Sequence, residues 1–331
     1  MQSDKPVVDV LLAIYNGEFF LAQQIESILA QSYRQIRLIV RDDGSSDSSV
    51  AIVRSFAERY PEQVVLLEDT KGNLGSTGNF LQLLGFSVAD YVMLSDQDDV
   101  WLPEKVAITL SAMKKCEVLH GKSMPILVHT DLTVANKDLS VVSQSFWKYQ
   151  NIDPKLSGIN RLLVQNVVTG CTVMMNRSLM NLVRPVTDGI VEHDWWLALL
   201  AAAFGRIVHV DSPTLFYRQH GKNVLGAVRW DAWAACRKFL RRDTRKPFSG
   251  NLKKTRLQAA RFLQMYGPQL PTEVALKISS YVSLEHLSFF ARLVCIVRYR
   301  FYKNGIKRNA GMFLSLMDTP TSGHASIRDV N

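Results

Sequence analysis

Apolar residues in the first 130 positions alternate between short continuous runs and helical spacing. Five runs rich in Val, Ile and Leu predict strands: Val8–Ile14, Ile36–Val40, Val64–Leu67, Tyr91–Leu94 and Ile126–His129. Between them, Leu21–Leu29 and Val50–Tyr60 show helical periodicity, and Pro103 suits the first turn of a helix that runs to about Lys115. This alternation predicts an α/β fold with a mainly parallel sheet covered by helices on both faces.

The pattern changes from Arg229 onward. Trp230–Arg242 and Leu252–Tyr266 predict helices with aromatic and aliphatic residues on one side and Arg or Lys on the other. A third helical stretch is expected from about Thr272 to Tyr302, and the tail after Asp318 is expected to be disordered. We therefore predict a first domain over residues 1–226, a helical region over 227–318 and a disordered tail over 319–331.

No apolar stretch approaches the roughly 18 to 20 residues that a membrane-spanning helix needs. The best candidate, Leu287–Val297, is interrupted by Arg292, and the polar segment Met1–Pro6 does not resemble a signal peptide. We expect a protein that does not span a membrane.

Composition adds one strong asymmetry. With 47% hydrophobic and 21% charged residues in 331, the chain is typical of a globular protein. Residues 1–220 hold 19 Lys and Arg against 24 Asp and Glu, whereas residues 221–331 hold 20 against 6, a net charge of +14. Four scattered cysteines without metal-ligand spacing indicate reduced thiols. The acidic first part and the basic second part are expected to have different roles.

Three carboxylates follow the fourth predicted strand, at Asp96, Asp98 and Asp99. A solvated acidic turn before a helix would explain them, but the carboxyl end of a parallel strand is also where such sheets bind ligands. Carboxylates this close repel one another unless a cation lies among them. A divalent cation held there could bind a diphosphate.

Two further segments fall at the same predicted edge. A turn at Gly44 with a helix cap at Ser46 and Asp47 explains the segment after the second strand, but not Asp42 and Asp43. An Asp at this strand end could accept the imino N–H of uracil or thymine. The run Gly72–Asn79 suits a backbone that passes close to a nucleotide, although many loops have this composition.

Taken in order, these segments resemble the family 2 glycosyltransferases with the GT-A fold. The matching segments are Ala13–Asn16, Asp42–Asp47, Asn73–Ser76, Asp96–Asp99, Thr169–Cys171, Glu192–Trp196 and Tyr217–Asn223. Together they cover roughly residues 7 to 226. The combination of Ser-Asp-Gln-Asp-Asp-Val-Trp, His-Asp-Trp-Trp and Tyr-Arg-Gln-His-Gly looks most like the rhamnosyltransferase branch that builds bacterial surface polysaccharides.

The resemblance implies a nucleotide-sugar site and a Mg²⁺ or Mn²⁺ site. Asp43 would contact the pyrimidine, and Asp98 and His220 would bind the metal ion. The residues implied to bind the nucleotide-sugar are Ala13, Tyr15, Asn16, Asp42, Asp43, Asn73, Gly75, Asn79, Asp96 and Gln97.

The resemblance also implies that Asp194 is the general base for an inverting displacement, at the start of the predicted helix Trp195–Phe204. The commonest acidic pair before this base is here His193-Asp194, with Glu192 one place earlier, so His193 is open between a structural and a catalytic role. Acceptor or secondary roles are implied for Asp131, Gly170, His193, Trp195, Trp196 and Arg218. A strand-end cap is an equally open reading of Asp131, and at least one of the two tryptophans is expected in the core.

For the basic last third, three readings compete. Solvated helices could pack on the first domain, a nucleic acid could bind the positive charge, or an anionic membrane could receive the aromatic residues. The candidate aromatic and aliphatic residues are Trp230, Trp233, Phe239, Phe289, Phe290, Leu293 and Phe301. A lipid-linked acceptor favours the membrane, so we expect no nucleic acid partner and a cytoplasmic protein, peripheral on the cytoplasmic face of the inner membrane.

The expected activity is metal-dependent, inverting transfer of L-rhamnose from dTDP-rhamnose to a saccharide or lipid-linked oligosaccharide in surface polysaccharide (O-antigen or capsule) synthesis. The alternatives are a UDP-hexose or UDP-N-acetylhexosamine donor, and a non-catalytic nucleotide-binding or scaffold protein.

Overall fold

The computed structural model describes residues 5–185, 188–220 and 245–317, which contacts divide into two units. The first takes in 5–155, 167–185, 188 and 192–220; the second takes in 156–166, 189–191 and 245–317. The predicted boundary at Gly226, the predicted helix Trp230–Arg242 and the predicted tail over 319–331 lie outside the described residues and stay predictions.

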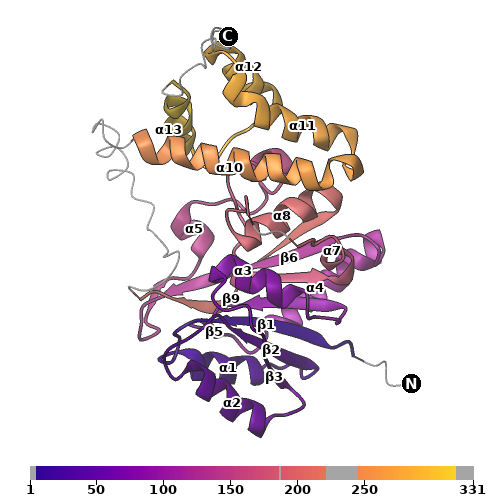
Figure 1. The fold of residues 1–331 in the computed structure, drawn as a ribbon, viewed down its shortest axis with the longest axis vertical. Coiled ribbons are helices and arrows are strands. Elements are labelled where there is room, and N and C mark those ends of the chain that lie inside the picture. Colours follow the sequence, from indigo (N-terminus) through magenta and orange to yellow (C-terminus); the bar gives the residue numbers. More distant parts are fainter. Residues whose placement is uncertain (1–4, 186–187, 221–244, 318–331) are drawn as a thin grey trace, which may run out of the picture. The chain divides into compact units, whose positions relative to one another are not determined.

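The first unit is built on a sheet with strand order β3-β2-β1-β4-β8-β6-β9-β5, and β7 pairs with β6 at its side (Figure 1). The strands are β1 (Val8–Ile14), β2 (Ile36–Asp42), β3 (Val64–Leu67), β4 (Tyr91–Ser95), β5 (Val100–Trp101), β6 (Ile126–Ala135), β7 (Val141–Ser143), β8 (Val173–Asn176) and β9 (Arg206–Arg218). The first four strands in space are parallel, as are β6 and β9, while β8 runs antiparallel to both β4 and β6.

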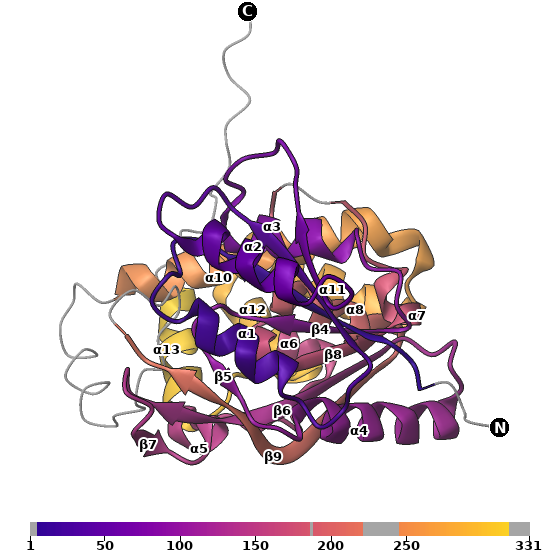
Figure 2. The ribbon, with the colours of Figure 1, turned by 90° about the horizontal axis from the view of Figure 1, so that it is seen from below.

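Helices cover both faces of this sheet. The helices of the first unit are α1 (Leu21–Leu29), α2 (Ser49–Arg59), α3 (Gly75–Leu84), α4 (Lys105–His120), α5 (Phe146–Gln150), the 3-10 helix η1 (Gly170–Thr172), α7 (Arg177–Met180) and α8 (His193–Phe204). Apolar residues of α1, α2 and α4 form one core layer with inward residues of the strands, such as Val10 and Met93. Helices α3 and α8 contact each other and pack on the other face (Figure 2).

The five strands predicted from the sequence are confirmed, with two changes of consequence. The sheet is mixed, because β8 is inserted antiparallel between β4 and β6. Strand β6 continues to Ala135, so Asp131 lies within a strand and not after it. The helix predicted from Pro103 begins at Lys105.

The second unit is helical. It contains α6 (Ile159–Leu162), α10 (Arg245–Tyr266), η3 (Gly267–Gln269), α11 (Thr272–Val282), η4 (Ser283–His286), α12 (Phe289–Tyr299) and α13 (Ile306–Met317). The stretch predicted as one helix from Thr272 to Tyr302 is therefore broken, at η4. Among the described helices, none is long and apolar enough to cross a membrane.

A buried histidine in the sheet predicts an acid-sensitive stability. The ring of His129 in β6 is fully buried and has no hydrogen-bond partner among the described residues. Burial, with the nearby His209, lowers the pKa of His129 to about 3. Between about pH 6.5 and 3 the unfolded chain therefore binds the proton that the folded chain refuses, so the free energy of unfolding falls as the pH falls. His129→Leu should flatten this slope by up to about 1.4 kcal/mol per pH unit, measured by urea unfolding across that range.

The matched control is the same substitution at His120, which is exposed at the end of α4. His120→Leu should keep the slope of the natural protein. An unchanged slope in His129→Leu would contradict the assignment of a neutral, buried imidazole.

Candidate active site

Three strand ends bring the predicted site residues together at one edge of the sheet. In the register of the parallel strands, Ile14 at the end of β1 pairs with Asp42, and Leu12 pairs with Ser95 at the end of β4. The segments that follow these strands therefore leave the sheet side by side. Ligands of α/β sheets bind at such carboxyl ends.

The segments after β1 and β4 are held by a reciprocal pair of hydrogen bonds. The N–H of Tyr15 donates to Gln97 Oε1 at 2.7 Å, and Gln97 Nε2 donates to the Tyr15 carbonyl at 2.9 Å. A side chain at Gly17 would come within 2.5 Å of Gln97, so this contact requires glycine there. The Tyr15 side chain is half exposed and Ala13 is partly exposed beside it, which leaves an aromatic ring available at the edge.

Asn16 braces the turn that follows β2. Its backbone is left-handed, with φ of 49°, and its Oδ1 accepts the N–H of Ser46 at 2.8 Å. The Asn16 N–H donates to Ser45 Oγ at 2.9 Å. An asparagine suits both demands, since it tolerates this conformation better than most residues.

Asp42 and Asp43 are adjacent but have different surroundings. Asp43 is buried, and its Oδ1 accepts hydrogen bonds from Arg41 Nη1 and from the N–H of Leu74, each at 2.8 Å. Asp42 Oδ2 accepts the N–H of Gly44 at 3.1 Å, whereas Asp42 Oδ1 is a buried acceptor with no hydrogen-bond partner among the described residues. Asp42 thus holds a buried oxygen without a hydrogen-bond partner among the described residues, and Asp43 Oδ1 ties β2 to the loop before α3.

These surroundings predict a division of labour between the two aspartates. Asp43→Asn should lower the free energy of unfolding by about 1–3 kcal/mol, because Arg41 loses a buried charged partner. Asp42→Asn should change stability by less than about 0.5 kcal/mol and weaken nucleotide binding about tenfold. Urea unfolding and calorimetric titration with dTDP measure the two effects. Loss of nucleotide affinity in Asp43→Asn at unchanged stability would support the pyrimidine contact that the resemblance implies for Asp43.

The loop before α3 is organised around the guanidinium of Arg41. This side chain donates to both carboxylate oxygens of Asp69, to the Gly72 carbonyl and to Asn79 Oδ1. Asn79 is 2% exposed, so it acts here as a buried support. Asn73 Oδ1 accepts the N–H of Gly75 at 3.2 Å, and Gly72 and Gly75 both have positive φ, which explains the glycines.

The acidic segment after β4 concentrates negative charge. Burial and the carboxylates of Asp98 and Asp194 raise the pKa of Asp96 to about 7, with Glu192 adding to the effect. Burial and the same segment's carboxylates raise the pKa of Asp99 well above its usual range. The carboxylates that follow β4 and those at the start of α8 therefore lie close together. The two motifs that contain them are far apart in the sequence, so it is the fold that brings them to one site.

Two groups of side chains, each containing acids of this segment, could hold a cation. Asp98 Oδ2 lies 2.7 Å from His220 Nε2, and the pair is largely buried. Asp96, Asp99 and Cys171 each place one ligand atom within 4.8 Å of the others. Carboxylate oxygens suit Mg²⁺ and Mn²⁺, whereas the imidazole of His220 suits Mn²⁺ better than Mg²⁺ and the Cys171 thiol suits neither. A cation would also relieve the repulsion that raises the pKa of Asp96. The residues therefore fit the divalent ion that the sequence predicts.

Arg218 holds this segment in place through hydrogen bonds. Its Nε donates to the Asp98 carbonyl at 2.9 Å, its Nη1 to the Lys137 carbonyl and its Nη2 to Gln23 Oε1, both at 2.6 Å. The Arg218 guanidinium also lies over the Phe20 ring, 4.6 Å from its centroid. Arg218 therefore fixes the backbone of the acidic segment, which is a positioning role.

Asp194 is oriented by the backbone of η1. It lies in the first turn of α8, and its Oδ2 accepts the N–H of Gly170 at 2.9 Å. A side chain at Gly170 would approach His193 Nε2 to 2.9 Å and Asp194 Cβ to 3.5 Å, so glycine allows this close contact.

His193 and the two tryptophans beside Asp194 belong to the packing of α8. His193 is buried against the Phe80 ring, with centroids 4.1 Å apart, and burial lowers its pKa to about 3. Trp195 and Trp196 are 7% and 0% exposed, which confirms the expectation that at least one is in the core. In this arrangement His193 is a neutral, packed side chain.

Asp131 caps a helix instead of facing an open edge. Its Oδ2 accepts Ser145 Oγ at 2.5 Å, and its Oδ1 accepts the N–H groups of Phe146 and Trp147 at 3.0 and 3.3 Å. The carboxylate therefore satisfies the start of α5. This helix cap differs from the strand-end cap considered for Asp131, and an acceptor role for Asp131 stays a prediction.

Two site residues carried no role in the sequence analysis. The Phe20 ring contacts His220, with centroids 4.8 Å apart, as well as Arg218. Cys171 was named only within the matching segment Thr169–Cys171, yet its thiol lies beside Asp96 and Asp99. Neither had a signal in the sequence, because each acts through a contact between distant segments.

Comparison with known proteins identifies the family of this chain. The profile described as Glycosyl transferase family 2 matches residues 9–182, more than half of the chain. The chain belongs to glycosyl transferase family 2. The family membership that the motifs predict is thereby confirmed.

This family 2 member is similar to proteins of known sequence and of known structure. The dTDP-rhamnosyl transferase RfbG of Shigella flexneri is 26% identical over 231 residues, which cover 65% of this chain and 74% of that protein. The S. aureus TarS 1–349 structure with UDP-GlcNAc has a TM-score of 0.53 at 13% identity, covering 94% and 90%. The Pyrobaculum calidifontis mannosyltransferase PcManGT with GDP-Man and Mn²⁺ has a TM-score of 0.52 at 16% identity, covering 95% and 86%. The structural likenesses confirm the GT-A fold.

Proposed function

We propose that this family 2 glycosyltransferase moves L-rhamnose from dTDP-rhamnose, with inversion, to a saccharide or lipid-linked saccharide of a bacterial surface polysaccharide. The observation that carries the proposal is the group of carboxylates from β4 and α8 at the carboxyl edge of the sheet, close enough to raise the pKa of Asp96. The choice of rhamnose is supported by the relationship to a dTDP-rhamnosyl transferase.

For the donor, we assign the imino N–H of the thymine to the Asp42 and Asp43 carboxylates at the end of β2, where Asp42 Oδ1 has no hydrogen-bond partner among the described residues. Tyr15 lies close by, because β1 and β2 end in register, and its exposed ring could stack on the base. Asp98 and His220, with Asp96 beside them, would hold a Mg²⁺ or Mn²⁺ ion. When bound, that ion supplies positive charge for the diphosphate leaving group.

For the acceptor, we assign the general base to Asp194. The acceptor hydroxyl oxygen forms a bond to the anomeric carbon while the bond from that carbon to the diphosphate oxygen breaks. The hydroxyl proton passes to the Asp194 carboxylate, which the Gly170 N–H holds in one orientation. Attack opposite the leaving group inverts the anomeric configuration in one step.

We also propose that the enzyme works at the cytoplasmic face of the inner membrane, with a lipid-linked acceptor and the basic helices toward the membrane. The proposal retains the predicted division into a catalytic domain over 1–226 and a basic region over 227–318. Support comes from the excess of positive charge after residue 220. A nucleic acid partner is not part of this function.

The competing donor is a UDP-hexose or UDP-N-acetylhexosamine. Uracil and thymine present the same imino N–H, so Asp42 does not distinguish them, and the similarly folded TarS was crystallised with UDP-GlcNAc. The alternative from a different functional class is a non-catalytic nucleotide-binding or scaffold protein. Both are outcomes of the same experiment.

The test is a thermal-shift titration with dTDP, UDP and GDP, with and without Mn²⁺, followed by a transfer assay with dTDP-rhamnose. A ligand at a hundredfold excess over its Kd stabilises the folded state by about 2.7 kcal/mol. We expect the largest metal-dependent shift with dTDP. A larger shift with UDP would replace the donor, and nucleotide binding without transfer from any donor would favour the binding protein.

A further inference from the structure

Helix α12 reverses the usual distribution of polar and apolar side chains. It buries the charged Arg292, which is 1% exposed, together with Ile296. It exposes Phe290, Val294 and Val297, at 78%, 66% and 58%. A helix on the surface of a unit normally does the opposite. A row of exposed apolar side chains of this kind is typical of a surface that meets a partner or a membrane.

The orientation of α12 is fixed by contacts inside its own unit. Arg292 Nε donates to the Leu284 carbonyl at 2.8 Å, and Arg292 Nη2 donates to the Glu285 carbonyl at 3.0 Å. Beyond the helix, Phe301 is fully buried with its ring centroid 5.2 Å from that of Tyr281. The helix cannot rotate its apolar side inward without breaking these contacts.

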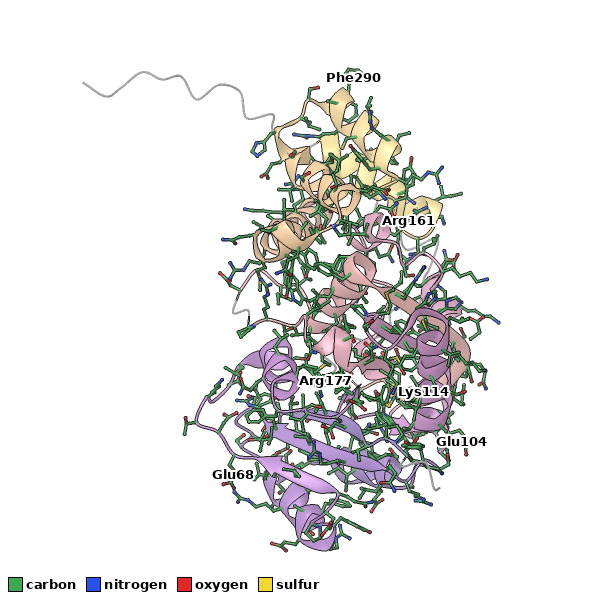
Figure 3. The ribbon with its side chains drawn as sticks, turned by 90° about the vertical axis from the view of Figure 1, so that its right-hand side faces the viewer. Glu68, Glu104, Lys114, Arg161, Arg177 and Phe290 are labelled. Carbon is green, nitrogen blue, oxygen red and sulfur yellow. The ribbon has the colours of Figure 1, made fainter. Side chains whose placement is uncertain are left out.

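The three exposed residues form one row. Positions 290, 294 and 297 are spaced by four and then three residues, so they lie on one side of the helix. We call Phe290, Val294 and Val297 the α12 stripe. Figure 3 shows Phe290 at the edge of the helical unit.

Basic residues predominate in the helical segment that carries the α12 stripe. The described segment 245–317 contains 13 Lys and Arg and only two acidic residues, Glu273 and Glu285. Arg298 and Arg300 are exposed at the end of α12, and Lys307 is exposed in the first turn of α13. Glu285 lies 3.2 Å from Arg256, so its charge is already paired.

We propose that the α12 stripe inserts into the headgroup region of an anionic membrane, with Arg298, Arg300 and Lys307 on the lipid phosphates. Apolar side chains beside a basic rim have the chemistry of an interfacial helix. The proposal deepens, and rests on, the membrane attachment in the proposed function. It differs from the sequence-based choice of aromatic residues, since Phe301 is buried and Trp230, Trp233 and Phe239 lie outside the described residues.

A second copy of the chain fits this surface less well. The same positive charge would face itself across a symmetric contact. Eleven residues of helix are about 16 Å long, and three side chains are far from the roughly 800 Å² per partner of a standard protein interface. A nucleic acid would engage the basic residues but would leave the stripe in water.

The experiment is flotation of the full chain with vesicles of phosphatidylcholine, with or without phosphatidylglycerol. We expect binding to the anionic vesicles, and a loss of about tenfold or more when Phe290, Val294 and Val297 are all replaced by Ser. The matched control replaces Leu257 and Leu276, which are 55% and 51% exposed on α10 and α11, by Ser, and should stay within about twofold. Arg298→Glu with Lys307→Glu should remove the preference for phosphatidylglycerol.

The outcomes separate this proposal from the proposed function. If the natural chain floats and the stripe variant floats equally well, another surface binds the membrane and the proposed insertion of the α12 stripe is wrong. If the natural chain does not float, both membrane attachment and the stripe are wrong, while rhamnose transfer to an acceptor without a lipid still stands on its own assay. If the stripe variant changes the molecular mass in light scattering and not flotation, a second copy is the occupant.

Discussion

Replacing Asp194 by Asn should lower kcat by about 10²–10⁴-fold and leave nucleotide binding unchanged. A positioned general base contributes a factor of this size, and an amide cannot take the acceptor proton. The substitution keeps the shape of the side chain and an oxygen that can accept the Gly170 N–H, so the start of α8 should stay folded. Transfer assays at saturating donor, with thermal-shift titration of dTDP on the same preparation, measure both quantities.

Glu192→Gln is the matched control, because Glu192 is the other carboxylate at the start of α8. Its Oε2 accepts a long hydrogen bond of 3.5 Å from Thr77 Oγ1. We expect less than about a tenfold loss of kcat. A loss in Glu192→Gln that equals or exceeds the loss in Asp194→Asn would move the base to Glu192 and contradict the proposed mechanism.

The fold was predictable where local pattern and long-range packing agree. The runs Val8–Ile14 and Tyr91–Leu94 are apolar because both faces of those strands are covered, and that alone identified them. Strand β8 was not predicted, because the four residues Val173–Asn176 gain their conformation from pairing with β4 and β6. Its Met174 and Met175 are fully buried in the core of the sheet.

At the candidate site, the sequence predicted which residues gather but not how their side chains are oriented. The motifs identified which acids gather at the sheet edge, because the carboxyl ends of neighbouring parallel strands meet there. They could not say that Asp43 turns toward Arg41 while Asp42 keeps an unsatisfied oxygen, since that depends on the exact end of β2 and on a loop 30 residues later. The sequence likewise marked Arg292 only as an interruption of the apolar stretch Leu287–Val297, and it gave no sign of the burial and the hydrogen bond to the Leu284 carbonyl that the structure shows.

Replacing Asp98 by Ala should abolish the metal-dependent part of the nucleotide thermal shift and lower kcat by about 10²–10³-fold. The reason is the loss of the carboxylate beside His220 from the proposed metal site, whose Lewis acidity is worth several kcal/mol. The metal-free protein should not be destabilised by the same change, because Asp98 is the largest charged contributor to the raised pKa of Asp96. Without ligand, the variant should therefore be as stable as the natural protein or more stable. Its thermal shift with nucleotide should be the same in Mn²⁺ and in EDTA.

The matched control is Asp90→Ala, an exposed aspartate immediately before β4 and thus at the opposite end of that strand from Asp98. It should keep the full metal-dependent shift. A metal-dependent shift that survives in Asp98→Ala, but disappears when Asp99 or Cys171 is replaced by Ala, would place the ion in the deeper group of ligand atoms. A shift that never depends on metal in the natural protein would contradict a resident cation, and the excess charge around Asp96 would then be offset by protonation below about pH 7.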